Sequence, residues 1–376
     1  MNSNYSTIPA YIRYSIFFTG ICALGFLVYI GQDIIIPICF ALLFAILLDP
    51  LVTLFQKIKI PRTLAITLAI IVAFLLISVS IYFISNQLSL FNESFPKFRE
   101  KFNIVSEQIK SWMSTEFNIS LQTINSQTDK WSKSIFDKSG AMIGYSVNKV
   151  TELIIMWLLI PVYVYLFLYY QTLLLLFIER VSDKGNQKKI GEVMIEGKKM
   201  IQSYLLGLLF EAIIMSILNS AGLLILGIEY AVLLGIIGAL LNVIPYLGGI
   251  VSTALPMLVA IVTKDSLSSP LLVLGVYLLI QFIDNNFIVP FVVASRVKIN
   301  ALFSIIVVLV FGSLFGIAGM FLAIPFIAIA KIIFDRVESL KPYGLLLGVD
   351  TPAHSKFINI FEKFRKDKIN KTKQKV

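Results

Sequence analysis

Apolar stretches of roughly 20 residues, about the length needed to span a membrane, recur along most of the chain. Because a helix rises about 1.5 Å per residue, such a stretch matches the hydrocarbon thickness of a bilayer. Each stretch therefore predicts a helix that crosses a membrane. The uninterrupted stretches cover residues 14–30, 34–55, 63–84, 153–178, 201–226 and 271–290.

Two more apolar regions, residues 231–262 and 301–334, are longer and are interrupted by glycine and proline. Proline removes a backbone donor and glycine loosens a helix, so neither region is expected to form one straight helix. If each region crosses the membrane, the protein has eight spans. If each enters and leaves on one side as a re-entrant hairpin, it has six. Arg296 and Lys298 favour the hairpins, because they then lie on the cytoplasmic side.

The second half of the chain contains one arrangement twice: a span with polar residues directly precedes an interrupted apolar region. This arrangement is typical of secondary transporters with an inverted internal repeat, whose binding site lies at the interrupted segments. For the glycines of the second region, tight helix packing is an equally good interpretation. The expected fold is an all-α polytopic membrane protein with six to eight transmembrane helices and two re-entrant segments.

Residues 86–150 are rich in serine, asparagine, glutamine and charges of both signs, which predicts a water-exposed helical arm. In its first half, apolar residues recur at steps of three and four, as in an amphipathic helix that starts or kinks at Pro96. A looser pattern from Ile124 to Tyr145 predicts a second helix returning to the membrane. The apolar seam would pack on itself, on a membrane surface or on neighbouring subunits. Its residues are Leu88, Phe91, Phe95, Phe98, Phe102, Val105, Ile109 and Trp112.

Lysine and arginine gather in residues 57–62 and 180–199, which predicts that these loops are cytoplasmic. Both termini are then expected in the cytoplasm of a bacterium, with the protein in its cytoplasmic (inner) membrane. The predicted parts are transmembrane helices in residues 1–85, the arm in 86–150, a transmembrane transport core in 151–334 and a basic cytoplasmic tail in 335–376.

Composition supports this picture and removes several classes of function. The chain is 57% hydrophobic and 14% charged, far from the balance of a soluble domain. Its formal charge of +10 is expected to set membrane topology and not to bind nucleic acid. Cys22, Cys39 and His354 are the only residues of their kinds, so the chain offers no disulfide framework, no Cys/His metal site and no Ser/His pair. No resident cofactor is expected.

The sequence also argues against two further functions, ATP-driven transport and intramembrane proteolysis. The segment from Gly191 to Lys199 has five residues between its glycines, where a phosphate-binding loop needs four, so ATP-driven transport by this chain alone is not expected. An intramembrane aspartyl protease needs two facing carboxylates, and Asp49 at a span end is a poor partner for Asp284.

The strongest candidate site lies in the last uninterrupted span, which contains Gln281, Asp284, Asn285 and Asn286. A carboxylate and three amides at this depth cost several kcal/mol unless they face protein, water or a ligand. We therefore interpret them as a functional cluster. The alternatives are hydrogen bonds that hold helices together and an ion pair between Asp284 and Arg296.

Further candidates lie in the preceding span and in the interrupted regions. Glu211 and Asn219 are two helical turns apart, roughly on one face. The amide and the residues that break the helices are Asn242, Pro245, Gly248, Gly249, Gly316 and Gly319.

Four stretches, in the same order along nearly the whole chain, resemble the autoinducer-2 exporter family of bacterial transporters. They read DPLVTLFQKIKIPRTLAI, MIQSYLLGLLFEAIIM, ALLNVIPYLGGIVSTALP and QFIDNNFIVPFVVASRVKINALFSIIVVLVFGSLFGIAGMFLAIP. The resemblance implies a transporter that forms homo-oligomers, with the insert after the third span as an arch. It places the family's most distinctive motifs on Pro245 to Gly249 and on the cluster from Gln281 to Pro290. The family often has glutamate at Asp284, and many members have Arg-Gly at Leu206-Gly207.

We therefore expect a secondary transporter that exports a small polar solute, such as the autoinducer-2 signal, coupled to H⁺ or Na⁺. Asp284 would bind the coupling ion with help from Asn285, Asn286 and Asn242, since burial favours the protonated form of a carboxylate. Backbone carbonyls and half-helix ends near the broken segments would bind solute or ion. Amide side chains, Gln281 among them, would supply hydrogen bonds to a neutral solute.

Two alternatives remain open at this point. The first is a Na⁺(Li⁺)/H⁺ antiporter that uses Asp284 and Glu211 in turn. The second is a non-transporting oligomeric membrane scaffold organised by the arm. In each case the expected partners are membrane lipid and further copies of the chain, together with a small polar solute or a monovalent cation in the first two functions.

Overall fold

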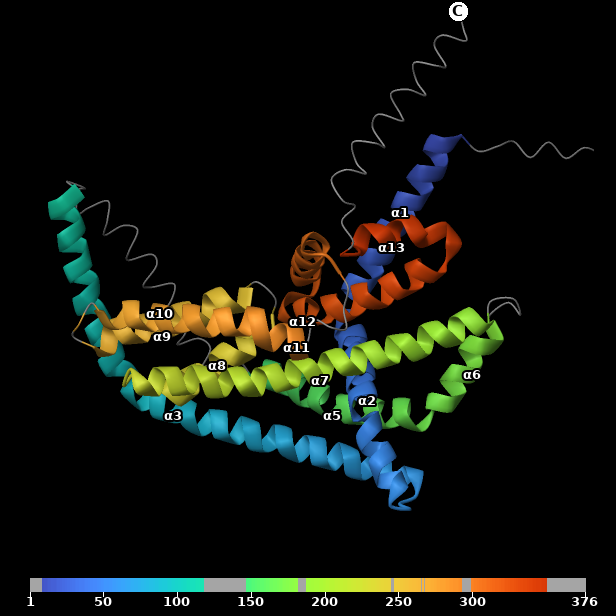
Figure 1. The fold of residues 1–376 in the computed structure, drawn as a ribbon, viewed down its shortest axis with the longest axis horizontal. Coiled ribbons are helices and arrows are strands. Elements are labelled where there is room, and N and C mark those ends of the chain that lie inside the picture. Colours follow the sequence, from blue (N-terminus) through green and yellow to red (C-terminus); the bar gives the residue numbers. More distant parts are fainter. Residues whose placement is uncertain are drawn as a thin grey trace, which may run out of the picture.

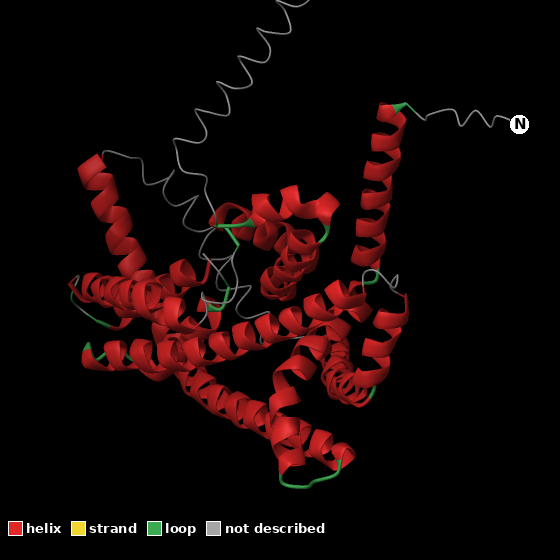
Figure 2. Ribbon diagram, turned by 45° about the vertical axis from the view of Figure 1, so that its right-hand side comes forward, coloured by secondary structure: helices red, strands yellow, loops and turns green. Residues whose placement is uncertain are grey.

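A computed structural model describes residues 9–117, 147–181, 187–244, 247–264, 266, 268–292 and 299–349. Within these ranges the regular secondary structure is helical, as Figure 2 shows. In the described residues, five helices are by length and composition able to cross a membrane, or six if one bent pair counts as a span. The prediction of an all-α polytopic membrane protein is confirmed.

The first two apolar stretches are expected to form an antiparallel pair of spans that reverses outside the cell at Gln32 and Asp33. The structure shows no such pair in helices α1 (Ala10–Ile30) and α2 (Gln32–Lys57). Gly31 alone separates them, with φ of −83° and ψ of 8°, and its carbonyl still accepts a hydrogen bond from the Ile35 N–H over 3.0 Å. Antiparallel helices need a connection of several residues, so the predicted reversal at Gln32 and Asp33 is wrong. Figure 1 shows α1 continuing away from α2, and the first two apolar runs give no support for placing the N-terminus.

Helix α3 (Arg62–Phe117) joins the third predicted span to the first half of the arm without interruption. The predicted amphipathic helix is confirmed as far as Phe117, with Pro96 inside the helix and not at its start. Trp112, near the end of the apolar seam, is 57% exposed. The predicted second arm helix, the part of the predicted tail (335–376) beyond residue 349 and both Arg296 and Lys298 lie outside the described residues.

The fourth predicted span is bent: α5 (Val147–Tyr169) and α6 (Gln171–Val181) meet at an angle of 63°. The bend places Gln171 beside a charged pair. With the oxygen and nitrogen of the Gln171 amide exchanged, the nitrogen donates to Asp49 Oδ1 over 3.2 Å and the oxygen accepts from Lys198 Nζ over 3.0 Å. Lys198 also donates to Asp49 Oδ2 over 2.7 Å. A polar junction thus joins α2, α6 and α7 (Gln187–Ile225).

The first interrupted region forms a hairpin of two helices, α8 (Ala231–Asn242) and α9 (Leu247–Thr263). The 12 residues of α8 rise only about 18 Å, too little to cross a hydrocarbon core of about 30 Å. Ala231 at the start of α8 and Ala260 near the end of α9 belong to the same buried cluster. The chain therefore returns to the end where it entered, so this region is a helical hairpin, as the re-entrant form requires.

The next span contains a local widening of the helix. Helix α10 (Ser268–Ile283) passes into a π-helical turn, η1 (Asp284–Ile288), and then into α11 (Val289–Val292). Pro290 follows this turn and has no backbone N–H to donate to the carbonyl of the preceding turn. Single π-helical turns of this kind are frequent at functional sites.

Helix α12 (Ala301–Arg336) folds back on itself, although it is long enough to span a membrane. Gly316 has φ of 61° and ψ of −147°, outside the helical region, where a residue without Cβ is favoured. The rings of Phe311 and Phe326 are 5.8 Å apart, whereas a straight helix would separate their backbones by about 22 Å. The second interrupted region is therefore also a helical hairpin, with Gly316 at its tip.

The two hairpins approach α7 from opposite ends (Figure 1). The first packs around Leu223 near the C-terminal end of α7, and the second packs against residues 200–208. Val243 at the first tip joins the cluster that contains α12 and the middle of α2, so the hairpins meet inside the protein. Each returning arm carries a fully buried proline, Pro256 or Pro325. This is the geometry expected of an inverted repeat.

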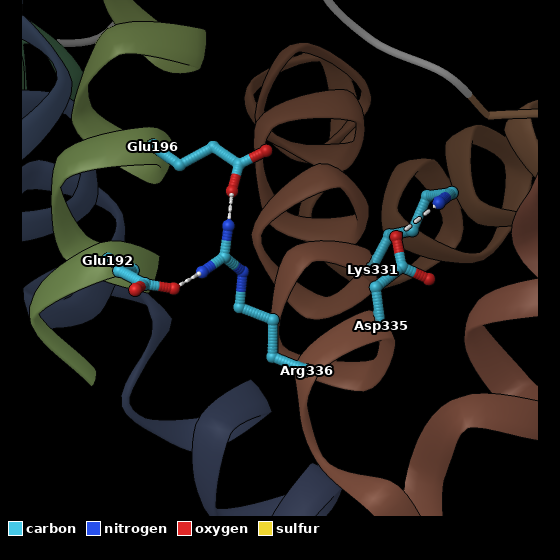
Figure 3. Close-up of polar contacts among 5 residues, drawn as sticks. All are labelled: Glu192, Glu196, Lys331, Asp335 and Arg336. Atoms are coloured by element: carbon cyan, nitrogen blue, oxygen red, sulfur yellow. Dashed lines mark hydrogen bonds and ion pairs between the residues drawn. The ribbon is translucent and has the colours of Figure 1, made fainter. Parts of the chain in front are cut away.

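Charged residues connect the end of the second hairpin to the start of α7 (Figure 3). Arg336 donates from Nη1 to Glu192 Oε2 over 2.5 Å and from Nη2 to Glu196. The two glutamates are one helical turn apart, so the planar guanidinium contacts both. After Arg336 the chain forms a short turn, η2 (Glu338–Leu340), and then α13 (Lys341–Leu347), which packs on α12.

We expect Arg336→Gln to lower the free energy of unfolding by about 1 kcal/mol or less, because partly exposed ion pairs contribute little. Thermal unfolding in detergent at low salt and at about 1 M salt would measure this, since salt screens exposed charges. Lys341→Gln is the matched control, because Lys341 pairs with Glu338 only within one turn, over 2.7 Å. A loss of the same size at both salt concentrations would contradict an exposed electrostatic contact.

Candidate functional site

Two carboxylates, one from the span that precedes each hairpin, lie in a shared polar cluster. Glu211 on α7 is 6% exposed, and Asp284, the first residue of η1, is 1% exposed. Asn242 at the end of α8 connects them: its Nδ2 donates to Asp284 Oδ2 over 3.0 Å and to Glu211 Oε1 over 3.4 Å. No lysine or arginine pairs with either carboxylate among the described residues. Two buried anions without a counter-charge are unfavourable, so the cluster favours a bound cation or proton.

Gln281 adds a second amide to the cluster, with Nε2 donating to Asp284 Oδ2 over 3.3 Å. Both amide nitrogens thus point to the carboxylate, and both amide oxygens face the first turn of α9. An alanine at Gly249 would place its Cβ 3.1 Å from Gln281 Oε1 and 3.9 Å from Asn242 Oδ1. Asp284 Oδ1 has no hydrogen-bond partner within the described part of the chain. The amide oxygens of Gln281 and Asn242 therefore lie beside Gly249, which has no side chain between them and the backbone.

Gly248 fixes the distance between the two arms of the first hairpin. A Cβ at this position would collide with the carbonyl oxygen of Leu241 and with Cα of Asn242. The absence of a side chain lets α9 lie directly against the end of α8. Gly248 therefore helps to hold Asn242 where its amide contacts both carboxylates.

Comparison with known proteins identifies the kind of protein that carries this cluster. The family model described as AI-2E family transporter matches residues 16–339. The chain belongs to the AI-2E transporter family. It is 24% identical over 325 residues to YueF of Bacillus subtilis strain 168, a candidate transport protein by its name, covering 84% of this chain and 87% of YueF.

Two Escherichia coli K12 proteins are similar over comparable lengths. TqsA, named an AI-2 transport protein, is 24% identical over 326 residues, covering 85% of this chain and 90% of TqsA. YhhT, a candidate transport protein by its name, is 21% identical over 326 residues, covering 86% and 91% of the two chains. This AI-2E transporter is thus a multi-pass membrane protein of a transporter family.

Not all predicted site residues of this AI-2E transporter join the carboxylate cluster. Asn285 and Asn286 are exposed, and Asn286 donates to the carbonyl of Phe282 over 2.8 Å. Gly316 is exposed at the second hairpin tip, whereas Gly319 is buried and packs against Phe311 and Phe315 in the facing arm. Pro245 lies outside the described residues.

Sequence reasoning missed two buried polar residues of the AI-2E transporter near the cluster. Tyr277 on α10 and Ser252 on α9 are 3% and 4% exposed, and the Tyr277 hydroxyl has no hydrogen-bond partner in the described chain. A signal for Tyr277 was present, because it precedes Gln281 by four residues and Asp284 by seven and so shares their helix face. Asn219 on α7, which was predicted, lies near these two and not beside Glu211.

A cavity of about 300 Å³ lies at the end of the second hairpin. Neither Glu211 nor Asp284 lines it. Its charged groups are already matched: Lys331 donates to Asp335 over 2.5 Å, and Lys341 donates to Glu338. The hydrogen bond from Lys341, and then its positive charge, lower the pKa of Glu338. The charged side chains at this cavity therefore have partners of opposite charge, whereas Glu211 and Asp284 have none among the described residues.

Proposed function

We propose that this protein is a secondary transporter in which Glu211 and Asp284 form one coupling site for H⁺ or Na⁺. The observation that supports the proposal is the buried carboxylate pair, linked through Asn242 and without a counter-charge. A bound proton or cation removes the cost of burying two negative charges together. The pair therefore gives the protein two electrostatic states that a transport cycle can use.

The position of Asn242 suggests how the ion acts on the fold. Asn242 ends α8, at the tip of the first hairpin, whereas Glu211 and Asp284 lie on neighbouring spans. With an ion bound, the amide and both carboxylates attract one another through it. Without the ion, the carboxylates repel each other and loosen the contact to the hairpin tip. Ion occupancy thereby controls how the hairpin packs against α7 and η1.

For the transported compound, we propose a small polar solute of the autoinducer-2 type, exported in exchange for the coupling ion. The similarity to TqsA, whose name specifies AI-2, supports this choice. Neutral hydrogen-bonding groups are present at the site in Asn242 and Gln281. Further copies of the chain are proposed as partners through the arm, where Trp112 is exposed.

A second candidate function is Na⁺(Li⁺)/H⁺ antiport without an organic solute. The two amide oxygens beside Gly249 and the unpartnered Asp284 Oδ1 favour it, because unhydrated Na⁺ is held by oxygen atoms at broken helices. Two carboxylates that share one amide would let a metal cation and a proton compete for the same position.

Purified protein in proteoliposomes with a trapped pH reporter tests both candidates. We expect addition of Na⁺ or Li⁺ to drive protons across the proteoliposome membrane. Addition of K⁺ should move fewer protons than either of these cations. If proton movement needs autoinducer-2 on one side, the protein is a coupled exporter; if the cation alone suffices, it is an antiporter. Absence of proton movement under both conditions, in verified and correctly inserted protein, would contradict coupling to H⁺ and with it the antiporter.

A further inference from the structure

Helix α6 carries a row of apolar side chains on the outside of the described protein. Leu173, Phe177 and Val181 follow one another at steps of four residues and so lie on one face of the helix. They are 61%, 63% and 70% exposed, and no residue of α6 is buried. These three side chains are called the α6 stripe below. An exposed apolar row of this kind needs a partner that is itself apolar.

The α6 stripe continues the outer face of α5. On that face Leu158, Val162 and Leu166 also follow one another at steps of four, and all three are exposed. The opposite side of α5 is buried against α2 and α3 through Val164 and Leu168. With 23 residues, α5 is long enough to cross a membrane by itself. The exposed row of this span therefore faces lipid, and α6 is not needed to complete the crossing.

Aromatic and charged side chains indicate that the bend between α5 and α6 lies at the membrane surface. Tyr169 and Tyr170 are half-exposed there, with their ring centroids 5.0 Å apart, and tyrosine is enriched where lipid meets water. On the inner side of the bend, Arg62 donates to the Leu168 carbonyl over 2.8 Å and to Thr172 Oγ1 over 3.4 Å. Both acceptors are neutral, and an arginine in such surroundings is costly deep in a bilayer.

The polar residues at the start of α6 face the protein. Gln171 lies at the junction with Asp49 and Lys198, and Thr172 accepts the hydrogen bond from Arg62. On a helical projection, Gln171 and Thr172 lie on the side opposite the α6 stripe. One side of α6 is therefore held by α2, α3 and α7, and the stripe points outwards.

The bend turns α6 away from the direction of the span (Figure 1). The two helices meet at 63°, so the axis of α6 lies nearer to the plane perpendicular to α5 than to the axis of α5. A side chain that inserts beside a helix carbonyl opens the helix on that side, and the helix bends the other way. Because Arg62 contacts the Leu168 carbonyl, α6 bends towards its stripe. The stripe thereby turns towards the acyl chains.

Basic side chains lie at the far end of α6. Arg180 in its last turn is exposed and borders the α6 stripe. Gln187 Nε2 donates to the Glu179 carbonyl over 3.4 Å, which places the start of α7 beside the end of α6. The exposed Lys188 and Lys189 follow directly. Positive side chains beside an apolar helix face are complementary to the phosphate groups of lipids.

We propose that α6 is an in-plane helix on the membrane surface, with its stripe among the lipid acyl chains and Arg180 at the lipid headgroups. The partner of this surface is the bilayer itself. In this position α6 anchors the start of α7, the helix that carries Glu211, to the membrane surface. The placement is independent of what the protein transports.

Spin labels on single cysteines of the full-length protein test this placement, in vesicles of phosphatidylethanolamine and phosphatidylglycerol. Cys22 and Cys39 are first replaced by serine. Labels at Leu173→Cys, Phe177→Cys and Val181→Cys should be reached by oxygen, which dissolves in lipid, more readily than by a water-soluble nickel chelate. Successive labels should differ in depth by about 3 Å or less. Four helical residues rise about 6 Å, and the bend leaves less than half of this along the direction of α5.

The matched controls are Leu158→Cys, Val162→Cys and Leu166→Cys in the exposed row of α5, whose labels should change depth by about 6 Å at each step. Equal depth steps in both rows would show that α6 continues the span. A preference of the α6 labels for the nickel chelate would place the stripe in water. Protection from both reagents would show that another copy of the chain covers the stripe. Each of these three results would overturn the in-plane placement.

Discussion

Replacing Asp284 by asparagine is expected to abolish cation-driven proton movement while the protein stays folded. Asparagine has nearly the same shape but carries no charge and cannot exchange a proton. Because Asp284 is buried and has no cationic partner in the described chain, removal of its charge also relieves an unfavourable burial. The unfolding temperature should therefore stay the same or rise.

Glu229→Gln is the matched control for Asp284→Asn, because Glu229 is exposed in the turn between α7 and α8. Proteoliposomes with a trapped pH reporter give the transport rate, and unfolding of the same preparations in detergent gives the stability. Unchanged proton movement in Asp284→Asn would show that Asp284 is not the coupling site. A phenotype that survives this variant and is lost when the exposed arm is altered would favour the scaffold function.

Alanine at Gly248 and at Gly319 is expected to destabilise the protein more than alanine at any exposed helical glycine. Each added Cβ would collide with a backbone carbonyl oxygen of the facing arm, that of Leu241 in the first hairpin and that of Phe311 in the second. Backbone cannot move aside as a flexible side chain does, so we expect a loss of about 1–3 kcal/mol for each variant. The similar size of the two losses follows from the similar packing of the two hairpins.

Gly275→Ala serves as the reference for these two variants, since its Cβ meets nothing within 4 Å. It should be neutral or raise the stability by up to about 1 kcal/mol through helix propensity. Chemical or thermal unfolding in one detergent compares the three variants. If Gly248→Ala and Gly319→Ala are as stable as Gly275→Ala, the hairpin arms do not pack as closely as described.

Much of the architecture follows from patterns that a sequence carries locally. The doubled arrangement of a polar span and an interrupted apolar region predicts the two hairpins, and Gly316 and Pro325 mark the second one. The connection between the first two runs does not follow from such patterns. Length and hydropathy identify both runs, but they do not show that Gly31 keeps a near-helical backbone and prevents a reversal.

The site was predicted in part, for a reason of helical geometry. Asp284, Asn285 and Asn286 are adjacent in sequence and were treated as one cluster, yet successive helical residues point about 100° apart. Only Asp284 faces the interior, together with Gln281 one turn earlier. The contact of Asn242 with both carboxylates depends on how the first hairpin folds back, and no local pattern encodes that contact.

The central claim is that Glu211 and Asp284 form one coupling site. The most direct test exchanges the lengths of these two side chains. Glu211→Asp, Asp284→Glu and the double variant keep both charges, and the double variant also keeps the combined length around Asn242. We expect each single variant to slow cation-driven proton movement and the double variant to recover part of the rate, because residues that share a site are not independent. Losses that simply multiply in the double variant would show two independent sites and contradict the account.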